Sequence, residues 1–146
     1  MRRLTLRACA SRPGLVFVLA HMAPTLTTLG LLETLAEPTR LRIVNCLAAA
    51  PLFVSDLQAL LDIPQPTVSR HLRVLRDAGL VRDTPIAQFV LYRLRRPADP
   101  LGRVLGAVLD AAVADSVLKG ERAGAFGQSR RHARVRTDSD LEGPPA

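Results

Sequence analysis

The chain has 146 residues, 48% of them hydrophobic and 3% aromatic, with a formal net charge of +7. This length is enough for one domain with a modest core, and the scarcity of aromatic residues predicts that aliphatic side chains fill that core. Two cysteines exclude a disulfide-stapled secreted scaffold and favour a cytoplasmic protein, while the positive net charge favours a polyanionic partner.

Residues 1–24 are predicted to form a mobile, basic arm. The first 21 residues contain four arginines and no acidic residue, so most of the excess charge lies in this segment. The apolar run at 15–20 is shorter than the core of a signal peptide and far shorter than a membrane span, so no membrane association is expected. We expect the arm either to add nonspecific phosphate contacts or to lie upstream of a natural start at Met22.

A first helix is predicted for residues 25–36, where leucines recur at helical spacing. One stripe of this helix is apolar and needs another element or another chain to cover it. The stripe consists of Leu26, Leu29, Leu32 and Leu35.

Two short helical patterns joined by a tight turn occupy residues 57–81. An S-x-x-Q capping box at Ser55 and Gln58 is predicted to start the first helix. In the turn, Asp62 is a residue type that tolerates a left-handed backbone, and Pro66 suits the first turn of the second helix. The shortness of the connection predicts that the two helices cross steeply, as in a helix-turn-helix.

The second of these helices is predicted to bury Val68, Leu72 and Leu75 and to leave a polar face in solvent. Arginine can form two hydrogen bonds with guanine, glutamine can do so with adenine, and hydroxyl groups can reach phosphates or base edges. This face therefore indicates a helix that enters the major groove of double-stranded DNA. The alternative is a bundle helix whose polar side is merely solvated. The predicted DNA-binding residues are Gln65, Thr67, Ser69, Arg70 and Arg73, with His71 either among them or a structural histidine at their edge.

A hairpin is predicted after Gly79, which suits a helix C-cap. Residues 80–82 and 89–94 read as two strands joined by a turn around Pro85. A helix-turn-helix followed by a hairpin is a winged helix, so the predicted fold is mainly α with a small β-hairpin (α+β). The hairpin tip lacks basic residues and glycine, which predicts a weak grip on the minor groove, and Gln88 is the one tip side chain expected to contact DNA.

Residues 100–119 are predicted to form a last helix with a broad apolar face of leucine, valine and alanine. Residues 121–146 contain clusters of glycine, proline and charge without apolar periodicity, so we expect a disordered tail that is first basic and then acidic. The basic run at 130–136 is expected either to contact phosphates or to remain solvated.

In their linear order, these segments resemble the ArsR/SmtB family of dimeric bacterial repressors. The resemblance rests on LAEPTRLRIVNCL at 35–47, VSDLQALL at 54–61 and QPTVSRHLRVLRDAGLV at 65–81, followed by the strand that carries Tyr92. It implies a winged helix-turn-helix domain over residues 25–120 that dimerises through its first and last helices.

The same resemblance implies a homodimer that represses transcription by occupying a palindromic operator. Such a dimer would present two recognition helices about 34 Å apart, which is one turn of DNA. The alternative is that both apolar helices pack within one subunit.

The chain departs from the family where relatives sense metals or thiols. Residues 52–56, where many relatives carry a Cys-x-Cys pair, contain no cysteine, and Asp110 and Asp115 of the last helix have no nearby histidine, so no metal or other cofactor is expected. Cys46 lies about one position from a cysteine that other relatives use as a sensor. A thiol- or arsenic-responsive repressor using Cys46 with Cys9 is therefore an alternative, although a lone cysteine in an apolar helix is usually a small buried hydrophobe.

Catalysis is not expected, because the sequence contains no glycine-rich phosphate loop and no recognisable Ser/His/Asp, Cys/His or metal grouping. The remaining alternative is a dimeric winged-helix module that binds a protein and has little affinity for DNA. The weak hairpin tip favours this alternative, whereas the polar face of the recognition helix favours DNA binding.

Overall fold

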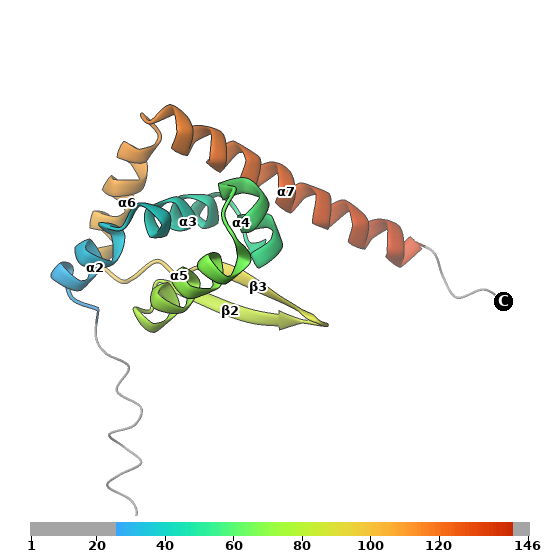
Figure 1. Cartoon of the computed structure of the whole chain (residues 1–146), viewed down its shortest axis with the longest axis horizontal. Helices are drawn as coiled ribbons and strands as arrows, with labels where there is room; N and C mark the ends of the chain where they lie inside the picture. The colour runs from blue at the N-terminus through green and yellow to red at the C-terminus, as the bar shows by residue number, and fades with distance from the viewer. Residues whose placement is uncertain (1–25, 142–146) are drawn as a thin grey trace, which may run out of the picture.

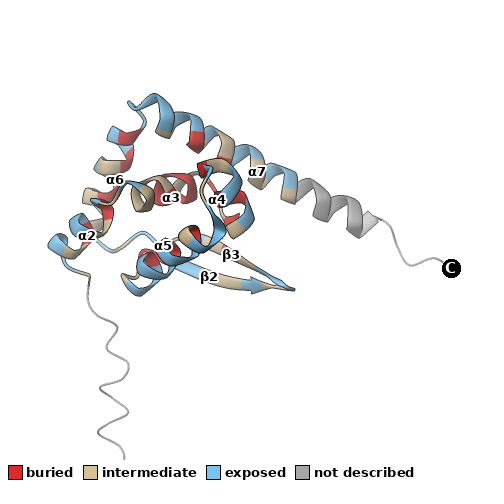
Figure 2. Cartoon of the chain, in the orientation of Figure 1, coloured by how far each residue is buried: buried red, intermediate tan, exposed pale blue. Residues whose placement is uncertain are grey.

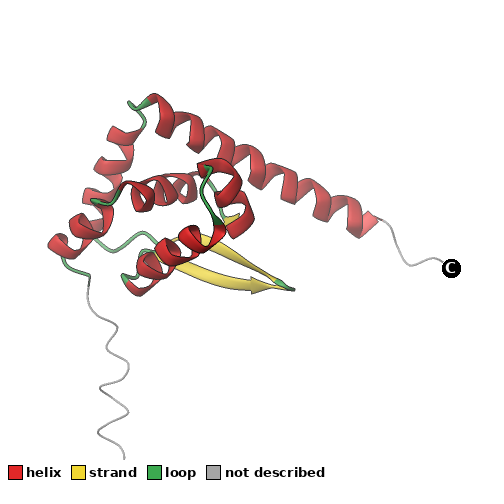
Figure 3. Cartoon of the chain, in the orientation of Figure 1, coloured by secondary structure: helices red, strands yellow, loops and turns green. Residues whose placement is uncertain are grey.

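A computed structural model describes residues 26–141 of the chain, which form helices and a small three-stranded sheet whose hairpin extends at one edge of the molecule (Figures 1 and 3). The predicted arm at 1–24 lies outside the described residues. Among those described, no helix has the length and apolar content needed to cross a bilayer. In chain order the elements are α2 (Thr28–Leu35), α3 (Pro38–Ala49), β1 (Leu52–Phe53), α4 (Val54–Leu61), α5 (Gln65–Asp77), β2 (Val81–Ile86), β3 (Phe89–Leu94), α6 (Leu101–Ala112) and α7 (Ser116–Leu141).

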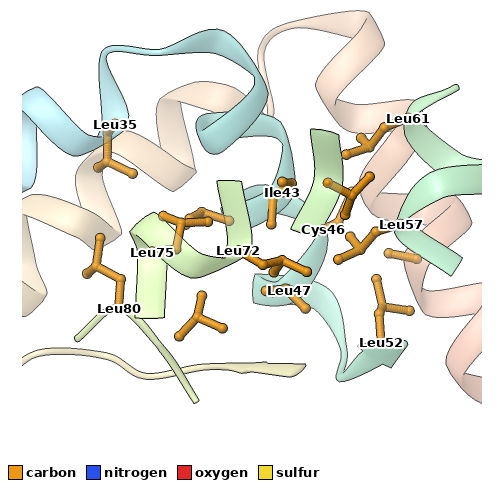
Figure 4. Packing of buried hydrophobic residues seen from close by; sticks show 14 of the residues in the cluster. Leu35, Ile43, Cys46, Leu47, Leu52, Leu57, Leu61, Leu72, Leu75 and Leu80 are labelled. Atoms are coloured by element: carbon orange, nitrogen blue, oxygen red, sulfur yellow. The ribbon is translucent and has the colours of Figure 1, made fainter. Parts of the chain in front are cut away.

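This element order confirms the predicted winged helix-turn-helix, in which α4 and α5 are the two helices and β2 and β3 form the wing. The core is aliphatic, as the composition predicts, and most of its members are leucines (Figure 4). α3 runs through the core with residues 43–47 all buried, and α4 and α5 both pack against it. The second helix of the pair therefore has one side fixed in the protein.

The sheet is antiparallel, with the strand order β1-β3-β2. β2 pairs with β3 along its whole length, and Ile86 lies opposite Phe89. The hairpin therefore turns at Ala87 and Gln88, with Ala87 at a φ of 50°, and the turn predicted around Pro85 was wrong. Pro85 can remain within β2 because an edge strand tolerates a residue that has no N–H to donate.

The ends of α5 form as their residues predict. Asp62, in the turn before α5, has φ 52° and ψ 49°, the left-handed conformation expected of it, and Pro66 lies in the first helical turn. Gly79 follows the helix with a φ of 75°, and the N–H of Leu80 donates to the carbonyl of Leu75 at 2.9 Å. The predicted glycine C-cap is confirmed.

The start of α4 differs from the prediction. The helix begins at Val54, so Ser55 lies inside it and the predicted capping box does not form. Instead, the buried carboxylate of Asp56 accepts the backbone N–H of Phe53 at 2.9 Å. An acid in the first turn also interacts favourably with the positive end of a helix.

The single last helix predicted for 100–119 is divided in the structure. α6 ends at Ala112, and α7 begins at Ser116, where the carboxylate of Asp115 accepts the N–H of Val117 at 2.8 Å. α7 then continues to Leu141 in place of the disorder predicted from residue 121, whereas 142–146 lie outside the described residues. The polar composition concealed this helix because it is attached to α3 partly by an ion pair rather than by an apolar stripe alone.

Candidate DNA-binding surface

The side of α5 opposite its buried stripe faces solvent (Figure 2). Four of the predicted DNA-binding residues are exposed on this side, namely Gln65, Ser69, Arg70 and Arg73, and Thr67 is half-buried. Among the described side chains, neither arginine forms an ion pair with an acid. Both guanidinium groups can therefore bind a ligand outside the protein without breaking an internal contact.

A groove of about 370 Å³ lies between the start of α4, the start of α5 and the wing. Gln65 of α5 and Gln88 of the wing turn both line it, so the structure brings these two predicted residues together. No side chain caps the amino end of α5, because Pro64 occupies the cap position. Pro66 has no N–H, and the N–H groups of Thr67 and Val68 donate to the carbonyl of Pro64, so it is the positive end of the helix dipole that favours an anion such as a phosphate.

His71 lies apart from the other predicted residues. Its Nδ1 is 3.3 Å from Oε2 of Glu37, a carboxylate that also caps α3 by accepting the N–H of Arg40 at 2.8 Å. Burial raises the pKa of Glu37, but the hydrogen bonds from Arg40 and Thr39, together with His71, lower it by more, so the pKa lies below its usual value. Of the two roles predicted for His71, this geometry favours that of a structural histidine, because its side chain joins α5 to the start of α3.

Arg76 connects the carboxyl end of α5 to the wing. Its Nη1 is 3.4 Å from Oδ2 of Asp83, and its Nε is 3.8 Å from Oδ1 of Asp77. Burial and the charge of Asp83 raise the pKa of the neighbouring Tyr92, and Arg76 opposes that effect. The charge of Arg76 is therefore balanced within the protein.

Two arginines that the sequence reasoning missed lie at the base of the wing. Arg82 of β2 and Arg93 of β3 are register partners, and both side chains are exposed. Like charges directly opposite each other destabilise a strand pair. A phosphate placed between them would remove that repulsion. The pairing could have been read from the sequence only if the turn had been placed at Ala87 and Gln88.

Cys46 is fully buried in α3, where its surroundings disfavour the thiolate. Burial and the nearby Glu121 raise the pKa of the thiol to about 12, against an opposing effect of Arg42. Because the thiolate is the form that reacts and binds metals, this environment argues against the thiol or arsenic sensor. Cys9 lies outside the described residues, and within those described no three His, Cys, Asp or Glu side chains form a group that could hold a metal ion.

Known proteins that are similar to this chain share its winged helix-turn-helix. Residues 37–83, from the cap of α3 to the first strand of the wing, match a family model described as bacterial regulatory protein, arsR family. The chain is also similar to the crystal structure of the transcriptional repressor BigR from Xylella fastidiosa. That match has a TM-score of 0.53 and 31% sequence identity, and it covers 60% of this chain and 85% of the other.

Two relatives with similar sequences are also named as transcriptional regulators. The chain is 48% identical over 64 residues to a biofilm growth-associated repressor of Agrobacterium fabrum, a match that covers 44% of this chain and 55% of that protein. It is 38% identical over 94 residues to an arsenic resistance transcriptional regulator of Pseudomonas putida, with 62% and 73% covered. The matches thus span from about half to about three quarters of these relatives.

We predict that Arg93→Ala raises the free energy of unfolding at low ionic strength, because it removes the repulsion from Arg82. The gain should not exceed about 0.5 kcal/mol, since both side chains are exposed and water screens them. Urea denaturation at low and high salt measures it, and the gain should shrink as salt screens the pair. Arg103→Ala, which removes an exposed arginine of α6, is the matched control. Destabilisation of the Arg93 variant at low salt would contradict the proposed repulsion between Arg82 and Arg93.

Proposed function

The chain belongs to the ArsR family of bacterial regulatory proteins, and on that basis we propose that it is a transcriptional repressor that binds operator DNA through α5 and the wing. The observation that carries this proposal is the exposed, unpaired polar face of α5 around Arg70 and Arg73. Such a repressor acts in the cytoplasm, where the chromosome lies, and blocks access to a promoter by occupying it.

The face of α5 suits direct reading of bases in the major groove. Arg70 and Arg73 can each form paired hydrogen bonds with guanine, and Gln65 can form them with adenine. Ser69 and Thr67 are short enough to reach phosphates or base edges beside them. Specificity in this proposal therefore comes from the amino-terminal half of α5.

The wing contributes mainly contacts to the DNA backbone in this proposal. Gln88 and Gln65 line one groove, which suits the passage of a DNA strand between the wing and α5. Arg82 and Arg93 offer a second pair of positive charges at the wing base. Contacts of this kind add affinity and salt dependence without sequence preference.

The proposed protein partner is a second copy of the chain. α2 leaves Leu29 at 66% and Leu32 at 47% exposure, and Val117, at the start of α7, is 62% exposed. Leu31 and Leu35, on the other side of α2, are buried in the core of the same subunit. Because α2 packs against α6, these uncovered side chains suit a symmetric interface that presents two α5 helices to a palindromic operator.

A winged-helix module that binds a protein instead of DNA is the competing function. Protein interfaces favour an exposed aromatic anchor in their centre. The exposed face of α5 carries glutamine, serine and arginine but no aromatic residue. The composition of the surface thus supports DNA as the partner.

We predict that Arg70→Ala and Arg73→Ala each weaken binding to a promoter fragment from upstream of the protein's own gene. Each loss should be about 1–3 kcal/mol if the side chain reaches a base edge. Fluorescence titration measures it, with a duplex of scrambled sequence alongside. Arg103→Ala removes another exposed arginine, on α6, and should bind as the wild type does.

Two results would refute this placement. If both α5 variants keep wild-type affinity, α5 does not read the bases. If they lose affinity equally for the promoter and the scrambled duplex, these arginines contact phosphates only.

We also predict that Leu29→Glu weakens self-association at least about tenfold, because it places a charge in an apolar interface. Sedimentation equilibrium over a range of protein concentrations measures the change. Thr28→Glu adds the same charge at the exposed neighbouring position and serves as the control. A wild-type chain that sediments as a monomer, or a Leu29 variant that associates normally, would exclude this interface.

A further inference from the structure

α7 extends the winged helix beyond its DNA-reading elements and lies across α3 and α4 (Figure 1). It also contacts β1, the short strand that joins the wing sheet to the start of α4. α7 therefore contacts both the helix-turn-helix and the sheet.

His132 holds α7 to the start of α4. Its Nε2 lies 2.9 Å from Oδ1 and 3.0 Å from Oδ2 of Asp56. Asp56 is 6% exposed, and its Oδ2 also accepts the backbone N–H of Phe53 at 2.9 Å. A single buried carboxylate thus links α7 to Phe53, the residue just before α4.

The ring of Phe53 continues this connection to the wing. It meets the ring of His132, with centroids 5.1 Å apart and an angle of 80° between the planes. It also meets the ring of Phe89 in β3, with centroids 5.9 Å apart and an angle of 65°. Both contacts have the edge-to-face geometry that aromatic rings favour.

The outer part of the wing has only two strands. β1 pairs with β3 only at Tyr92 and Leu91, so the segment from Phe89 to the turn lacks a third strand. Two-stranded hairpins are marginally stable on their own. Phe89 is 55% exposed, and its edge contact with Phe53 is therefore important for where the turn and Gln88 lie.

We propose that His132 is a positioning residue for DNA binding. Together with Asp56 it fixes the ring of Phe53, and Phe53 in turn holds Phe89, which sets the place of Gln88 beside the amino end of α5. The part of this inference that concerns DNA rests on the proposed function. The part that concerns the wing does not.

Contacts near the start of α7 allow the role of His132 to be tested without detaching the helix. Arg42 of α3 donates to the buried Glu121 carboxylate, with its Nε at 2.8 Å from Oε1. Nδ2 of Asn45 donates to the carbonyl of Leu118 at 2.7 Å. These bonds keep α7 on α3 when the side chain at 132 is shortened.

The experiment compares His132→Ala with His132→Gln, whose side-chain amide can still donate to Asp56. The matched control is Phe126→Ala, which removes an aromatic ring from the same helix. Among the described residues, this ring has one cation–π contact, with the guanidinium of Arg130, and no contact with another ring. Wing mobility is read from the anisotropy of a fluorophore attached through Gln88→Cys in a Cys9→Ser background, where Cys46 is buried. Affinity for the promoter fragment is measured on unlabelled proteins, and urea denaturation monitors stability.

We expect His132→Ala to lower the anisotropy of the wing label and to weaken promoter binding about three- to tenfold, since a preorganised contact is lost. His132→Gln should restore most of both properties, and Phe126→Ala should change neither. Unchanged anisotropy in His132→Ala would overturn the inference, whatever happens to affinity or stability. If the wild type binds no duplex, the proposed function fails, and the anisotropy of the three variants still decides whether His132 positions the wing.

Discussion

Three buried side chains of α5 decide which side of that helix can meet DNA. Val68, Leu72 and Leu75 are at most 1% exposed, and α5 packs against both α3 and α4. Burying one such side chain stabilises a fold by about 1.5–3 kcal/mol, so rotation of α5 about its axis would cost far more than thermal energy. The polar face around Arg70 is therefore held in solvent by the core, so the proposed DNA-binding surface is already formed in the protein alone.

The wing is held in a different way. Its base is joined to the core through β1 and to α5 through the ion pair of Arg76 with Asp83, whereas its tip depends on aromatic contacts with Phe53. The two parts of the surface thus differ in how they are held, because aliphatic packing holds α5 whereas the wing tip has an edge contact between Phe89 and Phe53. α7 gives the protein a means of setting the weaker part through His132, which lies outside the matched family region at 37–83.

The periodicity of apolar residues in the sequence was sufficient to predict the helices that bury one face, above all α5. It was insufficient where side-chain chemistry or register decides the outcome. The helix after residue 120 depends on an ion pair with Arg42 and on small residues such as Ala125, which leave no apolar stripe to recognise. Proline normally marks a turn, but Pro85 lies in an edge strand, and this shift in the turn hid the pairing of Arg82 with Arg93.

The most direct test of the central claim is the map of backbone amide chemical shifts when the isotopically labelled protein is titrated with its promoter fragment. We predict that the largest shifts fall on residues 65–73, at the amino-terminal half of α5, with smaller ones at the wing turn. Shifts confined to α2 and α6, or none at saturating DNA, would contradict it.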